Sequence, residues 1–157
     1  LKPNFTAAYY KMGRVYIDLK QYPEALAAYK KIIALHPDDA TAHAWIGDVY
    51  TNLERYPEAI NAYKKSIDLR PSDAGVYYSM GNAHYRLGQY ADAVVACKKA
   101  IALQPDDADA YFNMGRAYEK LKQNTRAITA FEKVVALEPT GKGAEAAHRA
   151  IQRLRKQ

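Results

Sequence analysis

Apolar residues recur at helical spacing along the whole chain, in pairs of segments that a short polar break separates. In the first pair, Tyr9, Met12, Tyr16 and Leu19 are spaced three and four residues apart and mark one face of a helix. The break that follows leads into Pro23, and proline suits the first turn of a helix, where its missing N–H group would have no partner in any case. The pattern therefore predicts an all-α chain of helix-turn-helix pairs.

This pair of helices recurs along the chain at one constant interval, the step from Gly13 to Gly47. A glycine, an alanine, a leucine and a proline each form a column with this period: Gly13, Gly47, Gly81 and Gly115; Ala25, Ala59, Ala93 and Ala127; Leu35, Leu69, Leu103 and Leu137; Pro3, Pro37, Pro71, Pro105 and Pro139. A fixed period of this length is typical of stacked repeat architectures. The columns predict four repeats, at 6–39, 40–73, 74–107 and 108–141.

The polar breaks contain residues that start and stop helices. Pro37 ends one helix, and an aspartate that follows it can cap the next by accepting a backbone N–H. The fourth repeat departs from this chemistry, because Asn124, Thr125 and Arg126 replace the Tyr-Pro-Glu of the first two repeats. We expect Asn124 or Thr125 to cap that helix and Arg126 to oppose the positive helix terminus.

The two ends of the array differ. Residues 1–5 match the tail of a further repeat upstream, and Phe5, Ala8 and Met12 would lack a preceding helix, which predicts weak homo-oligomer formation through this end. Residues 142–157 carry an apolar stripe and a polar opposite face, which is what a capping helix requires. The alternative for this last helix is a contact of its arginines with an acidic surface or a nucleic acid.

The spacing of Met-Gly, Tyr, Leu, Ala, Tyr and Leu-x-Pro in each repeat resembles that of the tetratricopeptide repeat (TPR) family. The resemblance covers residues 6–141. It implies a right-handed α-solenoid of helix-turn-helix TPR units, in which the small glycine and alanine let the two helices of a unit approach closely. It also implies a concave groove that the first helix of each unit lines.

Composition and charge argue against several classes of function. The chain is 49% hydrophobic and 25% charged, as in a globular protein. Four of the six net positive charges belong to residues 142–157, so the body lacks the basic stripe that nucleic-acid binding needs. No apolar run approaches the ~18 residues of a membrane span, so we expect no membrane insertion. No signal peptide is visible, which favours the cytoplasm without fixing the location.

The residue types that carry catalysis are scattered. The four histidines form no metal-ligand spacing with one another, and His43 and His84 stand in columns that are mostly tyrosine, which favours core packing. Cys97 is the single cysteine and stands in an aromatic core column, which favours a buried structural thiol. We therefore expect no catalytic site, no metal and no cofactor, and the chain is not predicted to be an enzyme.

The helix face opposite the packing columns supplies the candidates for partner binding. Aromatic residues there would act as anchors, asparagines would bond a peptide backbone, and charges of both signs would flank them. The candidates are Tyr10, Arg14, Trp45, Asp48, Asn52, Tyr78, Asn82, Tyr85, Phe112, Asn113 and Arg116. Some of these side chains could instead stack only on neighbouring helices.

The leading hypothesis is a non-catalytic scaffold that binds a peptide or helical segment of a partner protein in the groove. One alternative is a self-assembly scaffold, and another is the regulatory TPR part of a larger enzyme such as a glycosyltransferase. The chaperone-tail clamp of some TPR domains is not expected, because its Lys and Asn positions hold Tyr10, Arg14 and Trp45 here.

Overall fold

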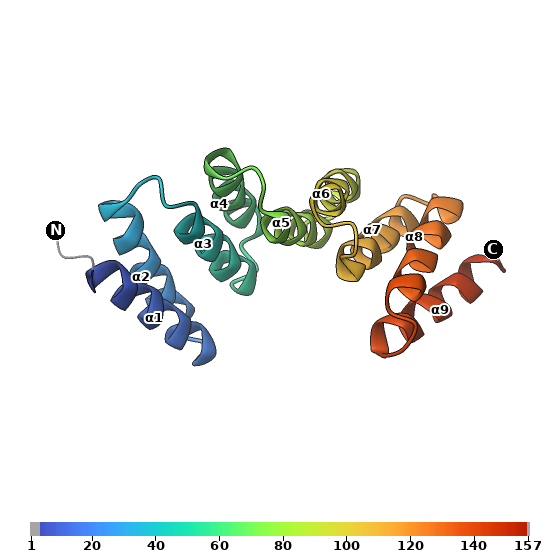
Figure 1. The fold of residues 1–157 in the computed structure, drawn as a ribbon, viewed down its shortest axis with the longest axis horizontal. Helices are drawn as coiled ribbons and strands as arrows, with labels where there is room; N and C mark the ends of the chain where they lie inside the picture. Colours follow the sequence, from blue (N-terminus) through green and yellow to red (C-terminus); the bar gives the residue numbers. More distant parts are fainter. Residues whose placement is uncertain (1–3, 157) are drawn as a thin grey trace. The chain divides into compact units, whose positions relative to one another are not determined.

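The computed structural model describes residues 4–156, and within them the chain forms nine α-helices joined by short turns (Figure 1). The helices are α1 (Asn4–Asp18), α2 (Tyr22–Leu35), α3 (Ala40–Asn52), α4 (Tyr56–Leu69), α5 (Ala74–Arg86), α6 (Tyr90–Leu103), α7 (Ala108–Lys120), α8 (Asn124–Leu137) and α9 (Lys142–Leu154). The helices α3, α5 and α7 begin one repeat apart, as the columns predict. The match of residues 1–3 to an upstream repeat lies outside the described residues.

The helix starts follow the expected chemistry in most repeats. Asp39, Asp73 and Asp107 each cap the helix that follows by accepting a backbone N–H three residues on, at 2.9–3.3 Å. Proline occupies the first turn of α2 and of α4.

The predicted cap of α8 is wrong. Asn124 and Thr125 lie inside the helix, whose cap residue is Gln123, and no side chain caps the helix there. Gln123 instead accepts a hydrogen bond from the Arg126 guanidinium at 2.8 Å. That guanidinium also lies over the ring of Tyr118. Arg126 is therefore held by its neighbours on the surface although it stands at the positive end of the helix.

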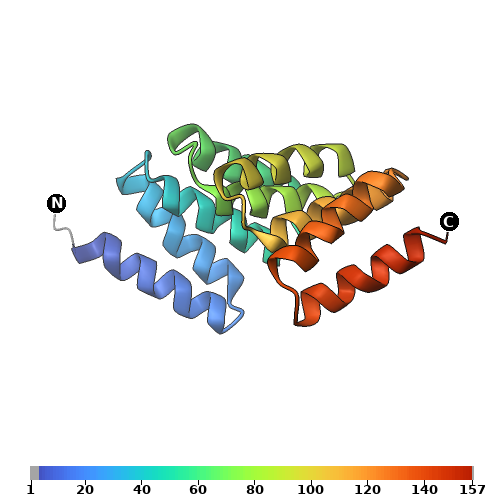
Figure 2. The same ribbon diagram turned by 45° about the vertical axis from the view of Figure 1, so that its right-hand side comes forward.

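The chain divides into two compact units, the first ending at Ser72 and the second beginning at Asp73. In the N-terminal unit, α1 and α2 lie side by side as an antiparallel pair, as do α3 and α4, and α2 also packs against α3 (Figures 1 and 2). The core of this unit includes Tyr29, Ile32, Ala42 and Val49, all fully buried.

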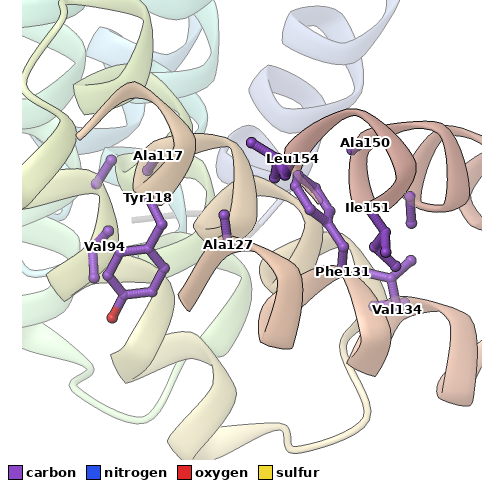
Figure 3. Close-up of a cluster of buried hydrophobic side chains, with 12 residues drawn as sticks. Val94, Ala117, Tyr118, Ala127, Phe131, Val134, Ala150, Ile151 and Leu154 are labelled. Carbon is purple, nitrogen blue, oxygen red and sulfur yellow. The ribbon is translucent and has the colours of Figure 1, made fainter. Parts of the chain in front are cut away.

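In the C-terminal unit, the core continues from α6 to α9. Phe131 of α8 is directed toward Ile151 and Leu154 of α9, and all three are buried (Figure 3). Two ion pairs hold α9 in place from outside: Arg153 to Glu119 of α7 at 2.7 Å, and Arg155 to Glu132 of α8 at 2.8 Å.

Close approach within each pair depends on a missing side chain. A Cβ atom at Gly13 would lie 2.5 Å from the ring of Tyr29, and one at Gly115 would lie 2.8 Å from the ring of Phe131. Each glycine therefore admits an aromatic ring of the second helix against the backbone of the first. The ring and the glycine together fix how the two helices pack.

His43, His84 and Cys97, which were expected in the core, are found there. His43 and His84 are buried and hydrogen-bonded, to the Pro37 carbonyl at 3.0 Å and to Gln89 at 2.7 Å. Cys97 is buried with a free thiol, and burial raises the pKa of that thiol to about 12. Met12, for which no preceding helix was expected, is 44% exposed on α1.

Within residues 4–156, no helix has both the length and the apolar character that a membrane crossing requires.

Candidate functional site

The predicted partner-binding residues divide between the two units. Five lie on α1 and α3 and are called the α1–α3 face: Tyr10, Arg14, Trp45, Asp48 and Asn52. Six lie on α5 and α7 and are called the α5–α7 face: Tyr78, Asn82, Tyr85, Phe112, Asn113 and Arg116. Arg14 and Asn52 are exposed, Asn113 is buried, and the others are half-buried.

Three aromatic rings meet on the α1–α3 face. Trp45 stacks on Tyr29, with the ring centroids 5.8 Å apart and the planes 7° from parallel. Tyr10 meets the same ring edge-on at 6.0 Å. Because Tyr29 is fully buried and the other two are half-buried, two partly exposed rings rest on a fixed one. Trp45 was expected to stand clear of the packing, but it also packs against the core.

The polar groups of Tyr10 and Asp48 are held by neighbours. The Tyr10 hydroxyl donates to Asp39 at 2.7 Å, so one carboxylate both caps α3 and fixes this ring. Burial and Asp39 raise the pKa of Tyr10 above its usual range. The Tyr63 hydroxyl donates to Asp48 at 2.7 Å, and Thr51 lies 3.1 Å from the same hydroxyl.

The other two predicted residues of this face differ in how much hydrogen-bonding capacity remains. Asn52 donates to the backbone carbonyl of Asp48 at 2.8 Å, which uses part of its amide within its own helix. Arg14 makes no hydrogen bond or ion pair within residues 4–156. Only Arg14 therefore offers an uncommitted charge on this face.

An open pocket of about 440 Å³ lies beside Tyr10 in the N-terminal unit. It is lined by Tyr10, His36, Asp38, Asp39, Ala40, Thr41 and Arg70. Carboxylates and a guanidinium face the same space, so it can accommodate polar groups of either sign.

On the α5–α7 face, an arginine joins two tyrosines. The Arg116 guanidinium lies over the Tyr85 ring, 4.3 Å from its centroid, which is favourable for a cation against an aromatic face. Tyr85 in turn meets Tyr90 edge-on at 5.4 Å. Arg116 is therefore held against the protein surface, unlike Arg14 on the other face.

The remaining residues of the α5–α7 face pack to different depths. Phe112 meets the buried Phe131 edge-on at 5.4 Å, as Tyr10 meets Tyr29. Asn113 is only 8% exposed, so its amide is not the free group that the sequence led us to expect. Burial is the main cause that raises the pKa of Tyr78. Asn82 is half-buried, with no side-chain hydrogen bond in the described chain.

One residue of interest escaped the sequence analysis. Tyr29 stands in a packing column, yet its buried hydroxyl has no hydrogen-bond partner among residues 4–156. A signal was present: the equivalent Tyr63 finds Asp48 and Thr51, whereas the first repeat has Arg14 and Ile17 at those two positions.

The repeats match known family models along most of the chain. A model described as "TPR repeat" matches residues 13–53 and 47–88, and one described as "Tetratricopeptide repeat" matches residues 78–142. The chain belongs to the tetratricopeptide repeat family. The predicted fold class, all-α and built of helix-turn-helix TPR units, is confirmed. TPR domains generally serve protein–protein interaction.

Solved TPR structures are similar to this chain. A crystal structure of MamA is 28% identical, with a TM-score of 0.87 over 92% of this chain and 83% of that one. The first TPR of Spaghetti (RPAP3) bound to the HSP90 peptide SRMEEVD is 29% identical, with a TM-score of 0.71 over 75% of this chain and 94% of that one. The Arabidopsis OM64 TPR domain is 27% identical, with a TM-score of 0.70 over 75% of this chain and 95% of that one. No curated protein matches the chain.

In the described part of this TPR chain, no three His, Cys, Asp or Glu side chains gather in a way that could hold a metal ion.

Proposed function

We propose that this TPR chain is a non-catalytic interaction module that binds a peptide or helical segment of a partner protein on its α1–α3 and α5–α7 faces. The observation that carries the proposal is the support beneath the half-buried aromatic residues. Trp45 and Tyr10 rest on Tyr29, and Phe112 rests on Phe131. Rings that are already fixed lose little conformational freedom on binding, and such aromatic anchors often dominate binding energy.

The charges near these rings favour a protein partner over a nucleic acid. Arg14 and Arg116 stand with Asp48 on the two faces, so the charges are of both signs and their balance is only +1. A phosphate backbone would require a run of cations along the surface. A peptide with side chains of both signs has no such requirement.

The experiment starts from a random twelve-residue peptide library displayed on phage and selected on the immobilised chain. Selected peptides are then titrated by calorimetry against Trp45→Ala and Phe112→Ala. Loss of a central anchor typically costs ~2 kcal/mol or more of binding free energy, which is about a thirtyfold loss of affinity. We expect at least one of the two variants to show that loss.

The matched control changes the outer surface. Lys64 and Lys65 are exposed on α4, away from the predicted faces, and the double variant Lys64→Ala, Lys65→Ala should bind like the native chain. Because Trp45 also packs on Tyr29, thermal melting of each variant must show that it is folded at the titration temperature. Peptides that depend on the lysines and not on the aromatic residues would overturn the proposal.

Self-assembly is the second candidate, and exposed apolar surface on α1 favours it. Phe5, Val15 and Leu19 are each more than half exposed; Phe5 and Val15 lie along one side of this helix with Met12, and Leu19 directly follows its end. Such patches on a single chain commonly mark contact surfaces.

A further inference from the structure

Tyr29 and Tyr63 occupy equivalent positions in the first two repeats but have different surroundings. The Tyr63 hydroxyl donates its proton to Asp48 at 2.7 Å, so the Thr51 hydroxyl at 3.1 Å donates to Tyr63. The Tyr29 hydroxyl is buried in the same way and has no partner within residues 4–156. Buried polar groups in proteins are nearly always hydrogen-bonded, so an exception needs a cause.

The charge that acts most strongly on the Tyr29 hydroxyl is positive. Burial raises the pKa of Tyr29 to about 12, and among the charged groups Arg14 acts most strongly, in the lowering direction. Asp48 and Asp18 act more weakly in the opposite direction. Asp18 stands one helical turn after Arg14, yet the two form no ion pair in the described chain. The guanidinium and the hydroxyl thus both retain donors.

The surroundings of the hydroxyl place it on the α1–α3 face. Tyr10 and Trp45, both half-buried, contact the ring of Tyr29 from two sides. Arg14 is exposed on α1, next to Gly13, whose missing Cβ lets the ring pass. A ligand on this face would therefore meet two aromatic rings and the Arg14 guanidinium, with the Tyr29 hydroxyl buried beneath them.

We propose that Tyr29 and Arg14 form a subsite for a carboxylate side chain of the bound peptide, with an apolar residue beside it on Trp45 and Tyr10. This rests on the function proposed above. A carboxylate suits the subsite because it only accepts hydrogen bonds, and bonds from a guanidinium to a carboxylate are among the stronger ones in proteins. A lysine or arginine of the partner would instead leave the Tyr29 proton unused and face Arg14.

The ligand must reach a hydroxyl that is buried in the free chain. By analogy with Asp48 and Thr51, the flanking side chains are those of Arg14, which is exposed, and Ile17, which is half-buried. Rotamer changes of such side chains are common when an interface forms, while the backbone moves little. The subsite therefore opens through side chains and needs no movement of helices.

The test uses the peptides selected on the native chain. We expect them to contain Asp or Glu, and one of them is made in two forms that differ only by Glu→Gln or Asp→Asn. The native chain should bind the acidic form about tenfold more tightly, which corresponds to about 1.4 kcal/mol. Tyr29→Phe and Arg14→Gln should each bind the two forms nearly equally.

Lys11→Gln is the matched control, since Lys11 is also an exposed cation on α1. This variant should keep the preference for the acidic form. A second readout is the ¹³Cζ resonance of Tyr29, which should move on binding the acidic peptide and stay in place with its amide counterpart. A preference that survives in Tyr29→Phe, or selected peptides without acidic residues, would overturn the subsite.

The outcomes separate the two proposals. Peptides that depend on Trp45 or Phe112 but do not discriminate acid from amide would remove the subsite and leave the proposed function standing. A selection that yields no peptide for either face would remove both.

Discussion

At the residue scale, we expect the stability of the chain to respond unusually when the Tyr29 hydroxyl is removed. A buried polar group without a partner destabilises the folded chain, so Tyr29→Phe should leave the free energy of unfolding unchanged or raise it by up to about 1 kcal/mol. Tyr63→Phe removes bonds to Asp48 and Thr51 and should lower it by about 1–2 kcal/mol. Urea unfolding of both variants, followed by circular dichroism, measures the difference. A clear loss of stability in Tyr29→Phe would mean that a bound water satisfies the hydroxyl.

The position of a side chain in this chain could be predicted from the sequence more fully than its contacts. The repeat period identifies which positions lie opposite the packing columns, and most of the named aromatic residues are indeed half-buried there. The period does not reveal how each group is used. Asn113 is buried against Tyr78, Asn52 bonds its own helix, and Trp45 stacks on Tyr29. These contacts depend on which residue faces the side chain in the folded chain, and the repeat period does not predict that residue.

At the scale of the element, a glycine within a helix has opposite effects in two places. At Gly115 an added Cβ would lie 2.8 Å from Phe131, a ring that the buried cluster around α9 holds in place. Gly115→Ala should therefore lower stability by about 1–3 kcal/mol through overpacking. Gly143 lies in α9 with its nearest neighbouring atom 3.8 Å away. Gly143→Ala should raise stability by about 0.5–1 kcal/mol, because alanine favours helix. Thermal melting of the Gly115→Ala and Gly143→Ala variants measures both changes in stability. Equal changes in melting temperature would contradict the packing described.

The start of α8 offers a second prediction for an element. Pro23 and Pro57 occupy the first turns of α2 and α4, and Thr125 is the equivalent residue of α8. Its backbone N–H lies in the first turn, where no intrahelical partner exists. Thr125→Pro should therefore stabilise the chain by about 0.4–1 kcal/mol by restricting the unfolded state. Hydrogen exchange of residues 126–130 should slow in the variant, and faster exchange there would show that proline does not fit.

Helix boundaries were the part of the fold most accessible to sequence reasoning. The aspartate caps and the proline starts are local chemistry, so they can be recognised without knowing the packing. The start of α8 could not be recognised in this way, because Arg126 is stabilised by Gln123 and by the ring of Tyr118 on α7. Contacts between helices decide such cases.

At the scale of the whole molecule, α9 covers one end of the array. Its apolar side chains Ala147, Ile151 and Leu154 are buried, and its outward residues are polar. Deleting residues 142–157 would uncover the apolar surface around Phe131 and remove both ion pairs to α7 and α8. We expect a lower melting temperature and aggregation, measured by light scattering during heating. A deleted chain that stays monomeric with an unchanged melting temperature would show that α9 is not a cap.

At the other end of the array, the exposed side of α1 is apolar, in contrast to the polar outer side of α9. Phe5, Met12, Val15 and Leu19 are 57%, 44%, 53% and 61% exposed, and their steps of seven, three and four residues fit the spacing that helix pairing uses. The equivalents of Met12 and Val15 on α3 are Ile46 and Val49, which are buried in the core that α2 and α3 share. The same face is therefore a helix-packing surface in the second repeat, whereas no helix among residues 4–156 covers it in the first.

We predict that two copies of this chain associate through their α1 helices. A helix of 15 residues is about 22 Å long, so the shared area falls well below the ~800 Å² per partner of a stable complex, and the dimer should form only at high concentration. Because the outer side of α9 is polar, the contact joins two like ends and closes as a dimer instead of extending as a filament. Sedimentation at increasing concentration should show the shift from monomer to dimer. Met12→Glu with Leu19→Glu should abolish it, whereas Val95→Glu, which changes an equally exposed residue on α6, should not. Association that survives the α1 variant, or larger assemblies that grow without limit, would contradict this geometry.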